Sequence, residues 1–159
     1  MKALDLRGLN PAPVTPFTRD GAVDYAAIQR LGSWLASVDG VKSLTVLGHA
    51  GEGTFLERDE QFKVIEAFRK AVDDKLPIIA GITLEGTQVA AEEAKRAVAA
   101  GASAGLVYPS HGWLRFGYQK GAPQDKYKAI YEASGLPLIL FQYPDATKCT
   151  YCLLYTSDA

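Results

Sequence analysis

The chain has 159 residues, of which 48% are hydrophobic and 22% charged, and its formal net charge at pH 7 is −1. This composition is typical of a globular domain with one sizeable core. It offers neither a basic stripe for nucleic acid nor an apolar run long enough to span a membrane, so neither partner is expected. With two cysteines and no apolar leader at the N-terminus, a reducing, cytoplasmic location is expected.

Short apolar runs alternate along the sequence with segments whose apolar residues recur at helical spacing. The predicted strands are residues 12–15, 43–47, 77–81, 105–108 and 137–141. The predicted helices are residues 24–38, 58–73, an alanine-rich helix from an N-cap at Thr87 to a stop at Gly101, and 123–134. Because strands that are apolar on both faces alternate with helices, the sequence predicts a parallel sheet with right-handed crossovers.

Two architectures fit this alternation: an open doubly wound sheet, or the first units of a (β/α)8 barrel. The loop after the first predicted strand, residues 16–21, lacks the G-x-G-x-x-G turn of doubly wound nucleotide domains. A glycine-rich turn follows the second strand instead, at residues 48–53, with the wrong spacing for a P-loop. The fold class favoured is therefore α/β, a (β/α)8 TIM barrel truncated after about five units. The glycine-rich turn either seats an anion on its backbone amides or uses glycine for turn geometry alone.

Five short motifs lie at the ends of the five predicted strands, in consistent order and spacing. They are PVTPF (13–17), GHAGEG (48–53), AGI (80–82), YP (108–109) and FQYP (141–144). With them the chain resembles, from about Gly8 to Thr147, the N-terminal half of the dihydrodipicolinate synthase / N-acetylneuraminate lyase family. The resemblance implies class I aldolase-type chemistry, without a cofactor, on a small 2-keto acid that is usually pyruvate.

The resemblance also implies roles for particular groups. A lysine forms a Schiff base with the keto carbon, and the protonated imine is an electron sink beside which a C–C bond can break or form. The substrate carboxylate lies on the turn that holds Gly48, Ala50 and Gly51, with Phe141 at the end of the fifth strand, so these four residues are expected to bind substrate. No metal site is expected. The full-length protein is expected to be a homo-oligomer, a dimer or a tetramer.

The chain departs from the family pattern at the site itself. His49 and Ala50 replace the two threonines of the usual G-T-T-G-E, His111 replaces a tyrosine, and Phe141 replaces the tyrosine of the fifth strand. Ala146 aligns with an arginine that holds a second substrate's carboxylate in the lysine-pathway enzyme, and its absence argues against aspartate semialdehyde as substrate. We therefore expect a family member outside the true dihydrodipicolinate synthases.

Three side chains are candidates for the proton transfers that the missing hydroxyls would perform. His49 and His111 are the chain's two histidines, and both align with the barrel mouth. Tyr143 lies two residues beyond Phe141, on the same face of the strand, and could supply the hydroxyl that Phe141 lacks. The alternative for all three is a purely structural role. The aromatic segment 111–118 is predicted as a loop, either a lid or a subunit contact.

The last eight residues, CLLYTSDA, read like a translated sequencing adapter. We expect residues 1–151 to be the N-terminal part of a single barrel domain and residues 152–159 to be non-native. The pair Cys149 and Cys152 is then no C-x-x-C redox site. In the family the Schiff-base lysine lies on a sixth strand, beyond the end of this chain, so the chain alone is expected to be inactive. The alternative from another class is a small non-enzymatic α/β domain that binds an anion.

Overall fold

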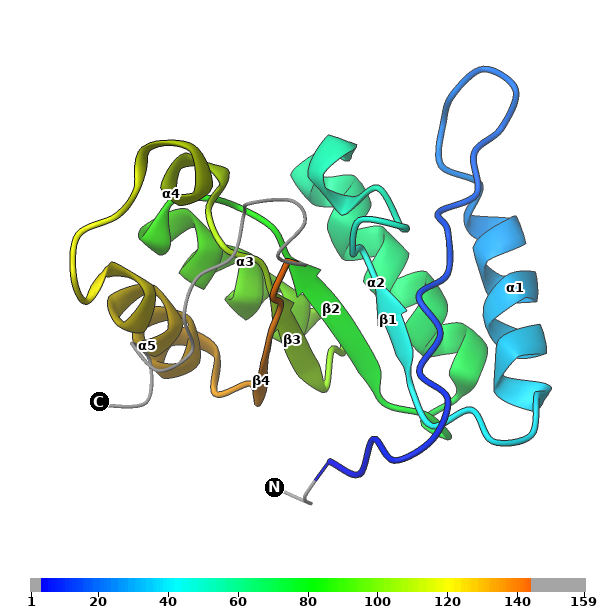
Figure 1. Cartoon of the computed structure of the whole chain (residues 1–159). Helices are drawn as coiled ribbons and strands as arrows, with labels where there is room; N and C mark the ends of the chain where they lie inside the picture. Colours follow the sequence, from blue (N-terminus) through cyan, green and yellow to red (C-terminus); the bar gives the residue numbers. More distant parts are fainter. Residues whose placement is uncertain (1–3, 144–159) are drawn as a thin grey trace.

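The computed structural model describes residues 4–143, which form a four-stranded sheet with helices packed against it (Figure 1). Every neighbouring pair of strands is parallel, and the spatial order is the sequence order, β1-β2-β3-β4. A doubly wound sheet reverses its strand order at a switch point, whereas successive units of a barrel do not. The order therefore favours the barrel. The strands are β1 (Leu44–Val46), β2 (Ile78–Ile82), β3 (Ala104–Val107) and β4 (Leu138–Leu140).

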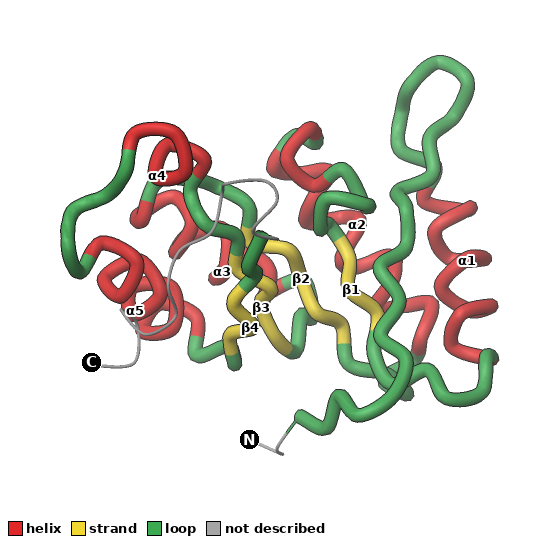
Figure 2. Tube along the Cα trace, in the orientation of Figure 1, coloured by secondary structure: helices red, strands yellow, loops and turns green. Residues whose placement is uncertain are grey.

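Helix α1 precedes the first strand, one or two helical segments connect each strand to the next, and the helices flank the single layer of strands (Figure 2). Their ends carry the expected signals: a capping box joins Glu57 and Glu60 at the start of α2, and Gly135 ends α5 with φ +67°. None of the described helices combines the length and the hydrophobicity that crossing a bilayer requires. The helical segments are α1 (Tyr25–Ser37), η1 (Gly53–Phe55), α2 (Arg58–Val72), α3 (Thr87–Ala99), α4 (His111–Phe116) and α5 (Ala122–Ser134).

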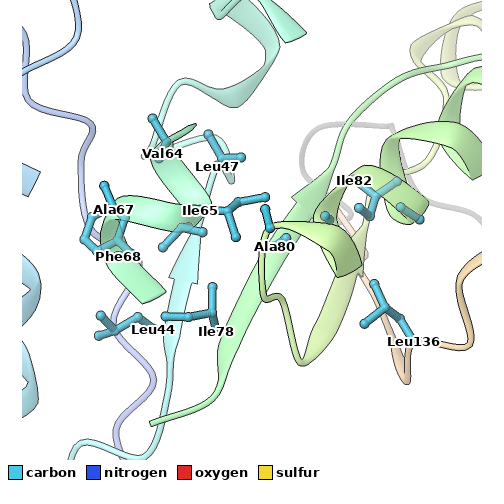
Figure 3. Packing of buried hydrophobic residues seen from close by; sticks show 14 of the residues in the cluster. Leu44, Leu47, Val64, Ile65, Ala67, Phe68, Ile78, Ala80, Ile82 and Leu136 are labelled. Carbon is cyan, nitrogen blue, oxygen red and sulfur yellow. The ribbon is translucent and has the colours of Figure 1, made fainter. Parts of the chain in front are cut away.

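The main core lies between the sheet and the helices α2 and α3 (Figure 3). Strand residues two apart point to the same face, so Ile78, Ala80 and Ile82 all face this core, as does Leu44 of β1. Phe68 of α2 is 1% exposed and packs in the same cluster. Burying such side chains contributes about 1.5–3 kcal/mol each, which makes this layer the main source of the fold's stability.

The predicted strand at residues 12–15 is wrong, because the structure forms no ladder there. The segment does run beside β1 (Figure 1): an isolated parallel bridge pairs Leu9 with Val41, and the Thr45 amide donates to the Pro11 carbonyl over 2.9 Å. Pro11, Pro13 and Pro16 have no amide hydrogen. A chain with so few donors cannot continue the ladder, so the segment covers the edge of β1 without joining it.

Two further details differ from the sequence prediction. Gly86, not Thr87, occupies the N-cap of α3, and Thr87 is the first helical residue. Residues 111–116 form the short helix α4 rather than a loop. Gly101, with φ +99°, follows the end of α3 as expected. The predicted domain boundary at residue 151, the tail and Ala146 lie outside the described residues.

Candidate active site

The candidate site lies where the parallel strands end. Since the carboxyl ends of parallel strands meet at one edge of the sheet, the segments that follow them come together there. The turn after β1 brings His49, the segment after β2 brings Glu85, the segment after β3 brings Tyr108 and His111, and the residues after β4 include Tyr143. Residues separated by up to 94 positions in the chain thereby become direct neighbours.

The turn after β1 is built by close backbone packing. Leu47 has φ +58°, a left-handed conformation that is uncommon for a residue with a branched side chain. A Cβ at Gly53 would collide with the Leu47 carbonyl, and a Cβ at Gly48 would come within 2.8 Å of the Tyr108 hydroxyl. Glycine is therefore needed at both positions for geometry, whether or not the turn also binds an anion.

The same turn leaves two amides directed to no protein acceptor. Those of Glu52 and Gly53 donate back to the carbonyls of His49 and Gly48, and that of His49 donates to the Tyr108 hydroxyl over 3.3 Å. Within residues 4–143, the Ala50 and Gly51 amides have no hydrogen-bond acceptor. Adjacent amides without acceptors can bind a carboxylate when both point to the same side of a turn.

The three candidate catalytic side chains form one hydrogen-bonded chain with a fourth residue. The Tyr143 hydroxyl lies 3.1 Å from His49 Nε2 and 3.2 Å from His111 Nε2. On its other side, His111 Nδ1 lies 3.2 Å from Glu85 Oε1. The structure thus brings His49, Tyr143 and His111 together as the sequence suggested. It adds Glu85, which sequence reasoning missed.

Aromatic rings pack against these hydrogen-bonded side chains. The Tyr108 ring lies 4.2 Å from the His49 ring and 4.6 Å from the Phe141 ring, and Phe141 meets Tyr143 edge-on at 5.0 Å. Burial lowers the pKa of His49, and the nearby His111 lowers it further, which favours the neutral imidazole. Burial also raises the pKa of Tyr108, against the opposing effect of the His49 amide. Phe141 thus packs against Tyr108 and Tyr143 and contributes no hydroxyl of its own.

A buried lysine under the site is the second residue that sequence reasoning missed. Lys126 of α5 is 0% exposed, and its Nζ donates to the carbonyls of Leu84 and Glu85 and to Ser110 Oγ over 3.0–3.1 Å. Burial lowers its pKa to about 8, although the carboxylates of Glu93 and Glu85 oppose the shift. A signal existed in the sequence: Lys126 falls on the helical stripe that buries Pro123, Tyr127 and Ile130.

Glu93 of α3 completes this support. Its Oε2 accepts from the amides of Thr83 and Leu84, each over 2.9 Å, and its Oε1 accepts from the Thr83 hydroxyl. Burial raises the pKa of Glu93, while these hydrogen bonds act in the opposite direction. The segment after β2 is therefore held at its amides by Glu93 and at its carbonyls by Lys126. In the described part of the chain, no group of three or more His, Cys, Asp or Glu residues could hold a metal ion.

The comparisons with known proteins agree with this architecture. The profile of the dihydrodipicolinate synthetase family matches residues 5–154, and the chain belongs to this family. A 4-hydroxy-tetrahydrodipicolinate synthase of Haloarcula marismortui is 36% identical over 150 residues, which cover 92% of this chain and 46% of the relative. Another, of a Synechococcus species, is 38% identical over 144 residues, which cover 87% and 45%.

Solved structures match over the same extent. Chloride-inhibited dihydrodipicolinate synthase from Acinetobacter baumannii, complexed with pyruvate, is 32% identical with a TM-score of 0.78, over 89% of this chain and 47% of that one. Dihydrodipicolinate synthase from Bacillus anthracis has a TM-score of 0.87 at 24% identity, over 98% and 52%, a likeness that concerns the fold. The barrel prediction is confirmed, and the chain spans about half the length of the curated relatives it matches.

Proposed function

We propose that the chain is the N-terminal part of a Schiff-base-forming lyase, of aldolase or dehydratase type, that acts on a pyruvate-like 2-keto acid. The observation that carries this proposal is the hydrogen-bonded chain of His49, Tyr143 and His111 beside the two amides of Ala50 and Gly51. The imine of a keto acid needs donors that hold its carboxylate and groups that transfer protons to and from the reacting carbon. Both kinds of group lie here at the carboxyl ends of the strands. Family membership and the pyruvate complex of the Acinetobacter baumannii relative support the same substrate class.

The proposed division of labour follows from the positions of the groups. The amides of Ala50 and Gly51, with Gly48 leaving room for Tyr108, hold the substrate carboxylate, and Phe141 forms an apolar wall. The keto carbon is then held near the Tyr143 hydroxyl, which passes protons to and from the reacting carbon. His49 and His111 lie within hydrogen-bond reach of that hydroxyl and can supply or accept the proton. Family membership favours this enzyme over the alternative of a small anion-binding domain.

The amine that forms the imine belongs, in this proposal, to the part of the parent protein that follows this chain. Among the described lysines, Lys126 comes near the site, with Nζ 3.5 Å from the Tyr108 carbonyl. However, this amine is enclosed by oxygen acceptors and has no exposed surface. A group held in this way is suited to support the loops rather than to attack a substrate.

The remaining properties of the whole protein are also proposals. We place it outside the true dihydrodipicolinate synthases because Ala146 replaces the arginine of that enzyme, although the relatives bear the synthase name. We expect a cytoplasmic homo-oligomer. In support, Phe55 of η1 is 84% exposed and Phe116 of α4 is 86% exposed. Rigid aromatic side chains of this kind suit subunit contacts.

Borohydride reduction tests the central proposal. The full-length parent, expressed from its complete gene, is incubated with pyruvate, reduced, and analysed by intact mass and peptide mapping. We expect one adduct per chain, on a lysine beyond residue 151 of the parent. The absence of any adduct would contradict the imine chemistry, and an adduct on Lys126 would contradict its supporting role.

A further inference from the structure

Glu85 is held at two points against the start of α4. Its Oε1 lies 3.2 Å from His111 Nδ1, and its Oε2 accepts from the Gly112 amide over 3.3 Å. The carboxylate thus contacts the one ring nitrogen of His111 that faces away from Tyr143. This arrangement has the form of a carboxylate that orients a catalytic imidazole.

The carboxylate determines which nitrogen of His111 carries the proton. An ionised carboxylate only accepts hydrogen bonds, so Nδ1 of His111 must be the donor in this contact. In a neutral imidazole the other nitrogen, Nε2, is then an acceptor. The Tyr143 hydroxyl, 3.2 Å from Nε2, therefore donates to His111. The Tyr143 oxygen can accept from His49 Nε2 at 3.1 Å. All hydrogen bonds in the series His49–Tyr143–His111 then donate in the same direction, from His49 toward His111.

We propose that Glu85 is a positioning residue that fixes His111 in the Nδ1–H tautomer and makes its Nε2 the terminal proton acceptor of the site. The catalytic part of this inference rests on the proposed function, whereas the tautomer does not. The two histidines then have opposite roles. His111 accepts the proton of Tyr143, and His49, in the Nε2–H tautomer, donates to the Tyr143 oxygen.

The backbone around Glu85 is fixed from three sides, as a positioning role requires. Its carbonyl accepts from Ser110 Oγ over 2.6 Å and from Lys126 Nζ over 3.1 Å. Ser110 in turn accepts from Lys126 Nζ over 3.0 Å and precedes His111 directly in the chain. One buried ammonium thus holds both the residue that carries the carboxylate and the residue next to the imidazole. Glu93 holds the two preceding amides, of Thr83 and Leu84.

The proton step follows from this direction. When the C–H bond beside the iminium carbon of bound pyruvate breaks, the proton goes to the Tyr143 oxygen. The Tyr143 hydroxyl proton passes at the same time to His111 Nε2. The electron pair of the C–H bond moves into the new C–C double bond, and the C=N pair returns to nitrogen to give the neutral enamine. His111 becomes an imidazolium that the Glu85 carboxylate stabilises, so the step needs no further reactant.

The tautomer is tested on the full-length parent by long-range 1H–15N correlation of 15N-histidine-labelled protein, with His111→Asn and His49→Asn used to assign the signals. We expect a protonated Nδ1 at His111 and a protonated Nε2 at His49. Glu85→Ala, which removes the acceptor, should shift His111 toward the Nε2–H tautomer. A wild-type His111 already in that tautomer would overturn the proposal, whatever the enzyme's activity.

The kinetic consequence is tested with pyruvate alone, by exchange of its methyl protons in D₂O. Glu85→Gln keeps the shape of the side chain but removes its charge, so exchange should slow about tenfold or more. Glu85→Asp should restore part of the rate, and borohydride should still trap the imine in all variants.

Glu92→Gln is the matched control, since Glu92 is an exposed acid of α3 paired with Lys95. It should exchange pyruvate protons at the wild-type rate. If Glu85→Gln exchanged pyruvate protons at the wild-type rate while His111→Ala exchanged them slowly, the positioning role of Glu85 would be overturned. If wild-type protein neither traps an imine nor exchanges protons, the proposed function fails. The tautomers of His111 and His49 then decide the positioning role alone.

Discussion

Lys126 Nζ donates to Ser110 Oγ over 3.0 Å, and both side chains are buried beneath the residues of the candidate site. The contact joins α5 to the segment after β3. Because the same ammonium also reaches the carbonyls of Leu84 and Glu85, it connects two of the segments that form the site. Buried polar groups with complete partners make a structure rigid, and the loss of one member leaves the others without partners.

Replacing Lys126 with methionine should lower the free energy of unfolding of the full-length parent by about 1–3 kcal/mol. Methionine fills similar space but cannot donate to the Leu84 and Glu85 carbonyls, which are left without this partner. Urea denaturation measures the effect. Lys128→Met is the control: this lysine is exposed, with a distant ion pair to Glu132, and its loss should change stability by less than about 0.5 kcal/mol. Equal changes in the free energy of unfolding for the two substitutions would show that the hydrogen bonds of Lys126 do not stabilise the fold.

The stability of the parent should also depend on pH through Lys126. Its pKa is lowered to about 8 from an ordinary value of 10.5, chiefly by burial. Between these values the unfolded chain holds the proton and the folded chain does not, so the free energy of unfolding rises with pH, by at most ~3 kcal/mol. Below about pH 8 the contribution is constant.

The measurement compares wild type with Lys126→Met by urea denaturation at several values between about pH 7 and pH 10. The difference between the two proteins should change with pH only above about 8 and should favour wild type increasingly. Tyr108, whose pKa is raised by burial, acts in the opposite direction at higher pH and is common to both proteins. A difference that is flat across the range would contradict the lowered pKa.

Loss of a proton-transferring side chain should slow the enzyme's turnover. In the full-length parent, His111→Ala, Tyr143→Phe or His49→Ala should each reduce kcat by about 10²-fold if the chain of hydrogen bonds carries the proton. Steady-state kinetics on the parent's own substrate, or proton exchange from pyruvate, measures this. Near-wild-type rates in all three variants would show that the role of these residues is purely structural.

The parent should not condense pyruvate efficiently with aspartate semialdehyde. Ala146 cannot form the bidentate pair that an arginine makes with the second substrate's carboxylate, and such pairs are among the stronger hydrogen bonds in proteins. A coupled assay for the condensation product gives the answer directly. Robust turnover would instead place the parent among the true dihydrodipicolinate synthases.

The 159-residue chain by itself should be inactive and poorly folded. The edge of β4 and the half-buried faces of its residues, Leu138 to Leu140, would be covered by further barrel units. Uncovered edges and apolar faces favour aggregation over a stable monomer. Size-exclusion chromatography and thermal melting test this expectation. A soluble species with a sharp, cooperative transition would instead identify an autonomous domain.

The sequence predicted the four strands of the sheet because they are apolar on both faces, a pattern that survives without tertiary context. Residues 12–15 also include apolar side chains, but Pro13 within the segment and Pro11 and Pro16 beside it remove donors that a ladder needs, so the hydrophobic pattern alone was misleading. Glu85 is polar, exposed and without a motif. Its role depends on His111, 26 residues away, and only the folded chain reveals it. Lys126 was detectable, since a charged residue on a buried helical stripe requires partners.

The close approach of Gly48 and Tyr108 also restricts the order in which this site can change by mutation. A methyl group at position 48 would meet the Tyr108 hydroxyl at 2.8 Å. Alanine at that position therefore becomes tolerable only after Tyr108 has become phenylalanine or a smaller residue. That first change removes the oxygen to which the His49 amide donates. Gly48 is therefore expected to stay glycine for as long as position 108 keeps its hydroxyl, although the two residues lie 60 positions apart in the chain.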